Sequence, residues 1–204
     1  MQKAWLPLLL LVGCASPSLG TAGELCPLTE GQQRVYEIRD ERQRVVRLDT
    51  RRVGGDVRRL GDQESVPFVF VFGTPDGMEH PTHKWIYAMP ADGPRAFHFD
   101  ALGRSLQHDP PIPLFPGSIE KGAEFIWIGT VTANRVPTRT SATIRIAGRE
   151  TLTVRGTAME TVRVETTYGG ADLEVTRWFA RDMGVVRMEI RAEPQRLEMV
   201  LVGP

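Results

Sequence analysis

The sequence predicts one all-β domain, an antiparallel sheet that is open or folded as a half-barrel or sandwich, with little helix. Three observations predict it. From Gln32 onward apolar and polar residues alternate with a period of two, no window of a dozen residues has apolar side chains at helical spacing, and turn-forming residues separate short strands. Regularly spaced short strands are typical of antiparallel sandwiches and open barrels. We expect this β domain to cover residues 26–204.

The first clear strand signal is an alternation of aliphatic and charged residues. Val46, Leu48 and Thr50 alternate with Arg47 and Asp49. In a strand, successive side chains point to opposite faces. The pattern therefore predicts a half-buried strand with one face in water.

Two further signals complete the first half of the domain. Residues 68–72 are apolar at every position and end at a turn cluster at 73–77, which predicts a central strand covered on both faces. Aromatic residues then alternate on both sides of a turn at 90–93, which is typical of a hairpin; they are Trp85, Tyr87, Phe97 and Phe99.

A proline-rich stretch separates the two halves. Residues 103–116 contain four prolines, and proline donates no hydrogen bond to a strand ladder, so we expect an irregular crossing there. Turn residues at 148–149, 169–170 and 182–184 separate the strands of the second half. The expected strands are 125–128, 143–147, 151–155, 161–167, 173–179, 185–191 and 197–202.

Each half opens with the same short motif. Residues 28–36 align with residues 119–127 at a spacing of 91: both have an aliphatic residue, a glycine three positions later, and an aliphatic-aromatic pair four and five positions after that. The repeat predicts that each half begins with the same turn into a strand.

The first residues have the organisation of an export signal. A short cationic start precedes the apolar run 4–12, which is too short to span a bilayer. The run ends in Leu11-Val12-Gly13-Cys14, which resembles the lipobox of bacterial lipoproteins. We therefore predict a signal peptide at 1–13, with cleavage before Cys14 and acylation of its thiol by chains such as palmitate. The alternative is an ordinary secretory signal, cut near Gly20 or Gly23, that discards Cys14.

A lipid-anchored Cys14 has consequences for the rest of the chain. Residues 14–25 become the anchor and a flexible tether of small and turn-forming residues. Ala15 follows the cysteine, and in lipoproteins of this type a residue other than Asp there implies sorting to the outer membrane. Cys26 is then left without a partner in the chain, either as a reactive thiol or as a small buried hydrophobe.

The charge balance argues against nucleic acid as a partner. The chain has 25 Lys and Arg against 25 Asp and Glu, so no net field attracts it to a polyanion. Alternating charges near the C-terminus predict a solvated outer face with cross-strand ion pairs; they are Arg163, Glu165, Arg177, Glu189 and Arg191.

A histidine cluster is the candidate site for metal chemistry. Glu79, His80 and His83 lie together, with Asp100 and His108 among the residues that follow, and imidazole with carboxylate suits Zn²⁺ or a general base. The simpler interpretation is a group of solvated loop histidines, because Pro81 interrupts regular structure between them. The alternative is a metal-dependent hydrolase with His80 and His83 as ligands. No nucleophile elbow, phosphate loop or dinucleotide fingerprint is present, so we assign no catalytic residue and no cofactor.

The aromatic residues suggest a binding face for an apolar molecule. On alternating strands they could line a concave cavity for an acyl chain, or they could simply fill the core. The residues assigned to that face are Phe70, Trp85, Tyr87, Phe97, Phe99 and Trp127. We therefore predict a non-catalytic domain that binds an apolar envelope molecule or a protein partner, on a membrane-anchored lipoprotein.

Several motifs together resemble a known group. The two half-openings, with residues 153–165 and 178–189, resemble a broad group of uncharacterised bacterial envelope lipoproteins with a "P-L-x-x-G-x-x-W-x-Y" opening and a "W-Y-A-x-x-x-G-x-V-x-x-E" strand pair. The resemblance implies the curved β-sheet of the LolA/LolB lipoprotein-carrier fold. Two departures from the pattern are Arg34-Val35-Tyr36 in the first opening, which lacks the expected Trp, and Phe179 in place of Tyr in the strand pair.

Overall fold

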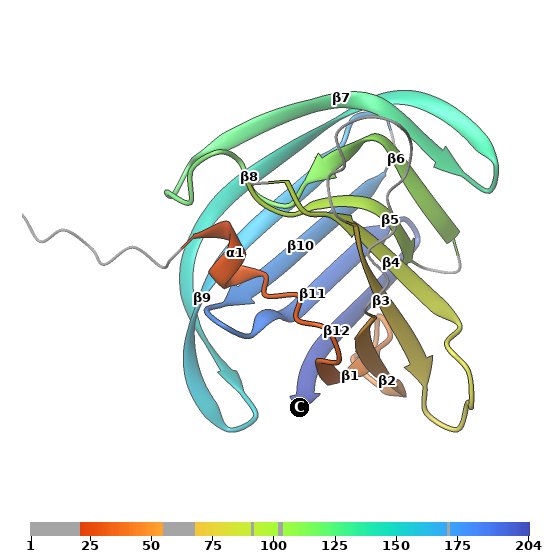
Figure 1. Cartoon of the computed structure of the whole chain (residues 1–204), viewed down its shortest axis with the longest axis vertical. Helices are drawn as coiled ribbons and strands as arrows, with labels where there is room; N and C mark the ends of the chain where they lie inside the picture. The colour runs from red at the N-terminus through yellow and green to blue at the C-terminus, as the bar shows by residue number, and fades with distance from the viewer. Residues whose placement is uncertain (1–20, 55–67, 91, 102–103, 171) are drawn as a thin grey trace, which may run out of the picture.

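The computed structural model is a closed β-barrel with one short helix. It describes residues 21–54, 68–90, 92–101, 104–170 and 172–204, and these contain twelve strands. Figure 1 shows the strands encircling the interior, with β7 and β8 arching over one side. The elements are α1 (Ala22–Leu25), β1 (Gln33–Arg39), β2 (Val45–Gly54), β3 (Phe68–Pro75), β4 (His83–Ala88), β5 (Arg95–Ala101), β6 (Arg104–Pro113), β7 (Glu124–Ala133), β8 (Val136–Val154), β9 (Thr157–Tyr168), β10 (Leu173–Ala180), β11 (Gly184–Ala192) and β12 (Gln195–Gly203). No helix among the described residues is long and apolar enough to cross a bilayer.

The barrel closes because the first strand pairs with the last. Each strand is antiparallel to the next along the chain, and β1 also pairs with β12, with Tyr36 opposite Leu201 and Ile38 opposite Met199. The domain is all-β, but the prediction of an open sheet, half-barrel or sandwich is wrong, because this pairing leaves β1 and β12 without free edges. The likeness to the LolA/LolB carrier fold is not confirmed, since the sheet closes on itself.

Apolar side chains fill one end of the barrel. Phe115, which follows β6, packs against Phe179 of β10 with ring centroids 4.6 Å apart, although these strands lie far apart around the wall. Leu25 and Cys26 are also buried in this core, at 0% and 5% exposure. The rings and the N-terminal segment thus meet inside the barrel and leave little room at this end.

The N-terminal segment 21–32 closes this end. The backbone N–H of Asp182, in the β10–β11 turn, donates to the Glu24 carbonyl at 2.8 Å, and Gly93 of the β4–β5 turn lies against Ala22. These two turns stand on opposite sides of the barrel, so α1 bridges its mouth, as Figure 1 shows. We call this the plugged end and the other the open end. Residues 22–25, assigned above to the tether, therefore form part of the barrel structure.

The two halves of the barrel begin in the same way. Gly31 and Gly122 both have positive φ angles, 78° and 86°, and each donates its N–H to the carbonyl of a later strand, to Val53 and Ile146 respectively. Five residues after each glycine an aromatic side chain points inward and is buried, Tyr36 at 2% and Trp127 at 3% exposure. The repeat at a spacing of 91 residues is thus structural, as predicted.

Two local predictions are wrong. Residues 104–113 form β6 and not an irregular crossing; the prolines are accommodated because β6 shifts register on β5 and pairs with β7 only through residues 106–109. The turn expected at residues 148–149 is a bulge inside the long strand β8, where the register on β9 shifts between Ile146 and Gly148.

We expect Leu25→Ala to destabilise the barrel by about 2–5 kcal/mol, because a fully buried leucine is replaced by a cavity in the plug. Urea denaturation measures the change. Leu48→Ala is the matched control, since Leu48 is 37% exposed on the outer face of β2 and its loss should cost much less. Equal losses of unfolding free energy in the two variants would mean that segment 21–32 does not contribute to the core.

Candidate functional site

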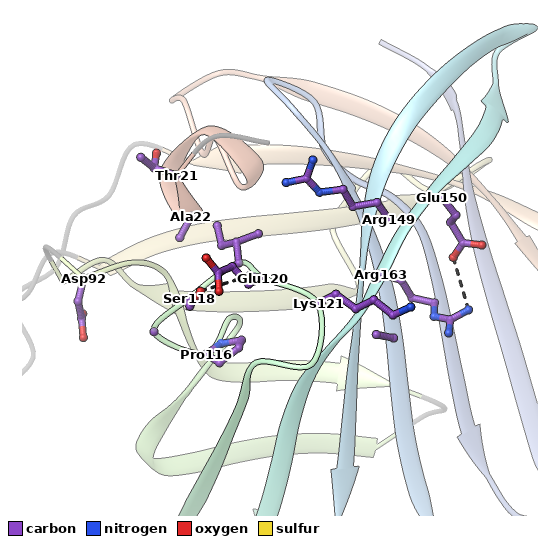
Figure 2. A pocket seen from close by; sticks show the side chains of 14 residues that line it. Thr21, Ala22, Asp92, Pro116, Ser118, Glu120, Lys121, Arg149, Glu150 and Arg163 are labelled. Carbon is purple, nitrogen blue, oxygen red and sulfur yellow. Dashed lines mark hydrogen bonds and ion pairs between the residues drawn. The ribbon is translucent and has the colours of Figure 1, made fainter. Parts of the chain in front are cut away.

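One hollow lies outside the plugged end. It is a groove of about 940 Å³ between α1, the β6–β7 connection and the bulge of β8. Figure 2 shows its polar lining, with Arg163 reaching Glu150 at 3.6 Å. Glu150 also accepts a hydrogen bond from the Trp178 indole, and Arg149 lies 3.8 Å from Glu160. Because these charges pair with one another, the groove offers a polar ligand few unsatisfied groups.

An apolar cavity lies at the open end. Its volume is about 500 Å³, and the strands that line it are β6 to β11. Leu106, Val131, Ala133 and Leu173 supply aliphatic surface, and Tyr168 lies among them. A hollow of this size and lining is typical of sites for small apolar molecules.

A second cavity of about 430 Å³ adjoins the first. One wall is apolar and is formed by the β1, β11 and β12 side chains Ile38, Met188, Ile190, Leu197 and Met199. The opposite wall, on β2, β4 and β5, is polar and includes Arg47, Asp49, Arg51, His83 and Asp100. The two linings share no residue, but both include residues of β6 and β11: Leu106 and Ala192 line the first cavity, and Ser105 and Ile190 the second.

Strand β2 turns its charged face inward. Arg47, Asp49 and Arg51 share a face with the buried Val53, whereas Val46 and Leu48 are 57% and 37% exposed. The alternation in this strand was predicted, and the structure shows that the charged side is the one that faces the interior.

Arg51 is held by aromatic rings. Its guanidinium carbon lies 3.7 Å from the centroid of Trp85 and 5.0 Å from that of Tyr36, and its Nε lies 3.7 Å from an Asp49 carboxylate oxygen. Gly73 permits this arrangement, because a Cβ there would lie only 2.7 Å from the Trp85 ring and 3.1 Å from Asp49. The cation is therefore fixed in place before any ligand arrives.

Several polar atoms of this wall lack hydrogen-bond partners. They are buried, and no described residue donates to or accepts from them: both carboxylate oxygens of Asp49, the Nε atoms of Arg47 and Arg51, and Nε2 of His83. Burial lowers the pKa of His83, and the charge of Arg47 lowers it further. Buried unpaired polar atoms are costly, so their concentration here marks the polar cavity as a candidate site.

A buried histidine lies deeper in the barrel. His108 of β6 has no exposed surface; its Nε2 and the Tyr168 hydroxyl form a hydrogen bond of 2.9 Å, and its ring stacks on Phe99 at 5.4 Å. Burial, with the charge of Arg177, lowers its pKa to about 4 against a hydrogen bond with the Phe97 backbone. The imidazole is therefore neutral at pH 7 and holds the aromatic wall together.

Most of the predicted ligand-binding aromatics point inward. Trp85 and Phe99 are buried opposite each other on β4 and β5, and Trp127 is buried on β7. Tyr87 faces the interior near Cys26, where burial raises its pKa to about 12. Trp85 alone of the set lines one of the open-end cavities. Phe97 is half-buried, and the side chain of Phe70 lies outside the part that the structure describes.

The two predicted metal ligands, His80 and His83, lie in different environments. His80 is exposed in the β3–β4 turn, whereas His83 begins β4 and lines the polar cavity. The described residues contain no group of three or more His, Cys, Asp or Glu side chains that could hold a metal ion.

The structure describes only one of the two cysteines. Cys14 lies outside the described residues. Cys26 is buried beneath the plug, where desolvation raises the pKa of its thiol to about 11. At neutral pH it is protonated and behaves as a small core residue, the second of the two interpretations given above.

Sequence analysis missed the polar wall of β2 and also Arg177. Arg177 was assigned to the solvated outer face, but it shares the inner face of β10 with the fully buried Val175 and Phe179. The available signal was the alternation itself, with Val175, Arg177 and Phe179 in one phase, which places the arginine with the buried side chains.

The comparisons with known proteins concern the fold. No protein-family model matches the chain, and no curated protein matches its sequence. It is similar to the crystal structure of a candidate lipoprotein from Parabacteroides distasonis ATCC 8503, with 11% identity, a TM-score of 0.49 and coverage of 88% of this chain and 97% of that chain. It is also similar to a candidate exported protein with a YmcC-like fold from Bacteroides fragilis NCTC 9343, with 13% identity, a TM-score of 0.47 and coverage of 87% and 97%. Identities this low assign no function to the chain.

His108 should make the barrel sensitive to acid. Its pKa of about 4 in the folded chain is below the ordinary value of 6.5, so the stability that it contributes is complete above pH 6.5 and is lost as the pH falls toward 4. Between pH 7 and pH 5 the loss is about 2 kcal/mol. We expect His108→Gln, which can still hydrogen-bond Tyr168, to lose about 2 kcal/mol less over that range in urea denaturation. An identical pH dependence in both proteins would contradict the assignment.

Proposed function

We propose that this protein is a lipid-anchored envelope protein whose barrel binds a small apolar or amphipathic molecule at its open end, without catalysing a reaction. The observation that carries the proposal is the asymmetry of the interior. Segment 21–32 and packed aromatic rings fill one end, whereas two adjoining cavities of about 500 and 430 Å³ occupy the other. Sites for small molecules are concave, largely apolar and preformed, often at the mouths of β-barrels.

The lining of the cavities favours a small molecule over a protein partner. Leu106, Val131 and Ala133 form recessed apolar surface that a flat protein interface does not reach. An apolar molecule that enters gains roughly 25 cal/mol for each Å² that it removes from water. The rigid, closed wall adds to this gain, because little ordering is needed on binding.

The proposed cellular location follows from the N-terminal residues. We infer that cleavage before Cys14 and acylation of its thiol anchor the chain in the outer membrane, with the segment after Cys14 as the tether. The described chain begins at Thr21, beside α1 at the plugged end. The tether therefore joins the barrel at the plugged end, and the open end is on the side away from the attachment point.

Ligand binding can be tested by mass. The chain from position 14, carrying Cys14→Ser and exported with a cleavable secretory leader, is purified from the periplasm of its own host and weighed under native and denaturing conditions. We expect bound mass that denaturation releases. Ala133→Trp should reduce it, because the ring fills the apolar cavity, whereas Ala158→Trp on the exposed end of β9 should not. A bare native mass, with no binding heat on titration with dodecanol, would contradict the proposal.

Anchoring can be tested separately. In the natural chain we expect the protein to sediment with outer membranes and to carry acyl chains on its first residue. Cys14→Ser should abolish both, because serine cannot take the diacylglyceryl thioether. Cys26→Ser is the matched control, and it should leave fractionation unchanged. Retention of Cys14→Ser in the outer membrane would show that a lipid on this residue is not the anchor.

A further inference from the structure

The inner face of the barrel carries an excess of positive charge. Arg47 and Arg51 project from β2, and Arg177 projects from β10 with 8% of its surface exposed. Asp49 is the buried carboxylate among them. The other buried carboxylates of the described residues, Glu189 and Glu198, alternate with inward-facing side chains of β11 and β12 and so lie on the outer face.

The acidic groups near the cavity do not balance these cations. Asp49 is 3.7 Å from Arg51 and compensates that side chain. Asp100, at the rim, already accepts hydrogen bonds from the Lys84 backbone at 2.7 Å and from His98 at 3.2 Å. Among the described residues no acidic side chain forms an ion pair with Arg47, and its Nε is buried without a hydrogen-bond acceptor.

The guanidinium of Arg47, which has no acidic partner among the described residues, favours an anionic ligand. Arg47 is half-buried with its Nε out of solvent, and a planar guanidinium matches the oxygens of carboxylate and phosphate groups. Here Arg47 and Arg51 line the same cavity, and the buried Nε2 of His83 supplies a further polar contact beside them. The three side chains come from two different strands, which fixes their spacing.

The rest of the cavity suits a hydrocarbon chain. Met188, Ile190 and Leu197 line its apolar wall, and Met199 on the same wall lies against Arg51, with its Sδ 2.8 Å from the guanidinium Nη2. The apolar cavity lined by Leu106 lies beside this one. A ligand that is anionic at one end and apolar along its length matches both cavities together. Neither a free inorganic ion nor an uncharged lipid uses both walls.

We propose that the ligand is an anionic amphiphile, with its carboxylate or phosphate group against Arg47 and Arg51 and its chain along the apolar wall. This inference rests on the proposed binding function and adds the chemical class of the ligand. Asp49 then acts as a positioning residue that holds Arg51 between the rings of Trp85 and Tyr36.

Calorimetry with a series of probes of equal chain length tests the head group. The chain from position 14 carrying Cys14→Ser, stripped of bound lipid, is titrated with dodecanoate, dodecyl phosphate, dodecanol and dodecylamine below their micellar concentrations, and with inorganic phosphate. We expect the two anionic amphiphiles to bind about tenfold or more tightly than dodecanol, because a charge-assisted hydrogen bond contributes that much. Dodecylamine and inorganic phosphate should bind more weakly than dodecanoate and dodecyl phosphate.

Arg47→Gln tests the residue. It should lower the affinity for dodecanoate about tenfold and leave the affinity for dodecanol unchanged. Arg52→Gln is the matched control, because Arg52 lies on the same strand with an exposed side chain, and it should change neither. Thermal unfolding of both variants checks that the barrel remains intact.

The outcomes separate this inference from the proposed function. Equal affinity for dodecanoate and dodecanol, or tighter binding of dodecylamine, would overturn the anionic head group while leaving a binding barrel. A loss of dodecanol binding in Arg47→Gln equal to the loss of dodecanoate binding would overturn the role of Arg47. Inorganic phosphate binding as tightly as dodecyl phosphate would overturn the amphiphile, and failure of every probe would remove the proposed function itself.

Discussion

The pairing of β1 with β12 is the constraint on which the rest of this structure depends. It joins Tyr36 to Leu201 and Ile38 to Met199 across almost the whole length of the chain, and it turns a twelve-strand meander of the described residues into a closed wall. Closure gives every strand an inner and an outer face. It also creates two mouths, and each must be filled, covered or left open to solvent.

The two mouths are treated differently. At one, the short α1 helix bridges opposite turns, with Leu25 and Cys26 beneath it. At the other, inward-facing arginines and a carboxylate without hydrogen-bond partners stand where aliphatic side chains would have completed the core. Polar groups that forgo hydrogen bonds reduce stability, and natural proteins retain such groups at sites of function. The difference between the plugged end and the open end therefore accounts both for the packed core and for the candidate site.

The sequence predicted the secondary structure better than the site. Alternation and turn residues placed strands such as β5, which contains Phe97 and Phe99, and the repeat of Gly31 and Gly122 predicted that both halves begin alike. The prolines of β6 do not interrupt the strand as predicted. The missing N–H of a proline matters only where a neighbouring strand would accept a hydrogen bond from it, and β7 pairs with β6 only as far as Asp109. His108 was placed in an irregular crossing for the same reason, although it is fully buried.

The sequence by itself determined that this chain is an antiparallel β protein, and its lipobox-like Cys14 motif gives the basis for predicting an envelope address. Only the tertiary structure decided that the sheet closes and that Arg47, Asp49 and Arg51 face inward. The physical reason is that a period of two assigns alternate side chains to two faces of a strand but does not indicate which face is buried. In β2 near the open end, the charged face lines a cavity and the aliphatic face meets solvent.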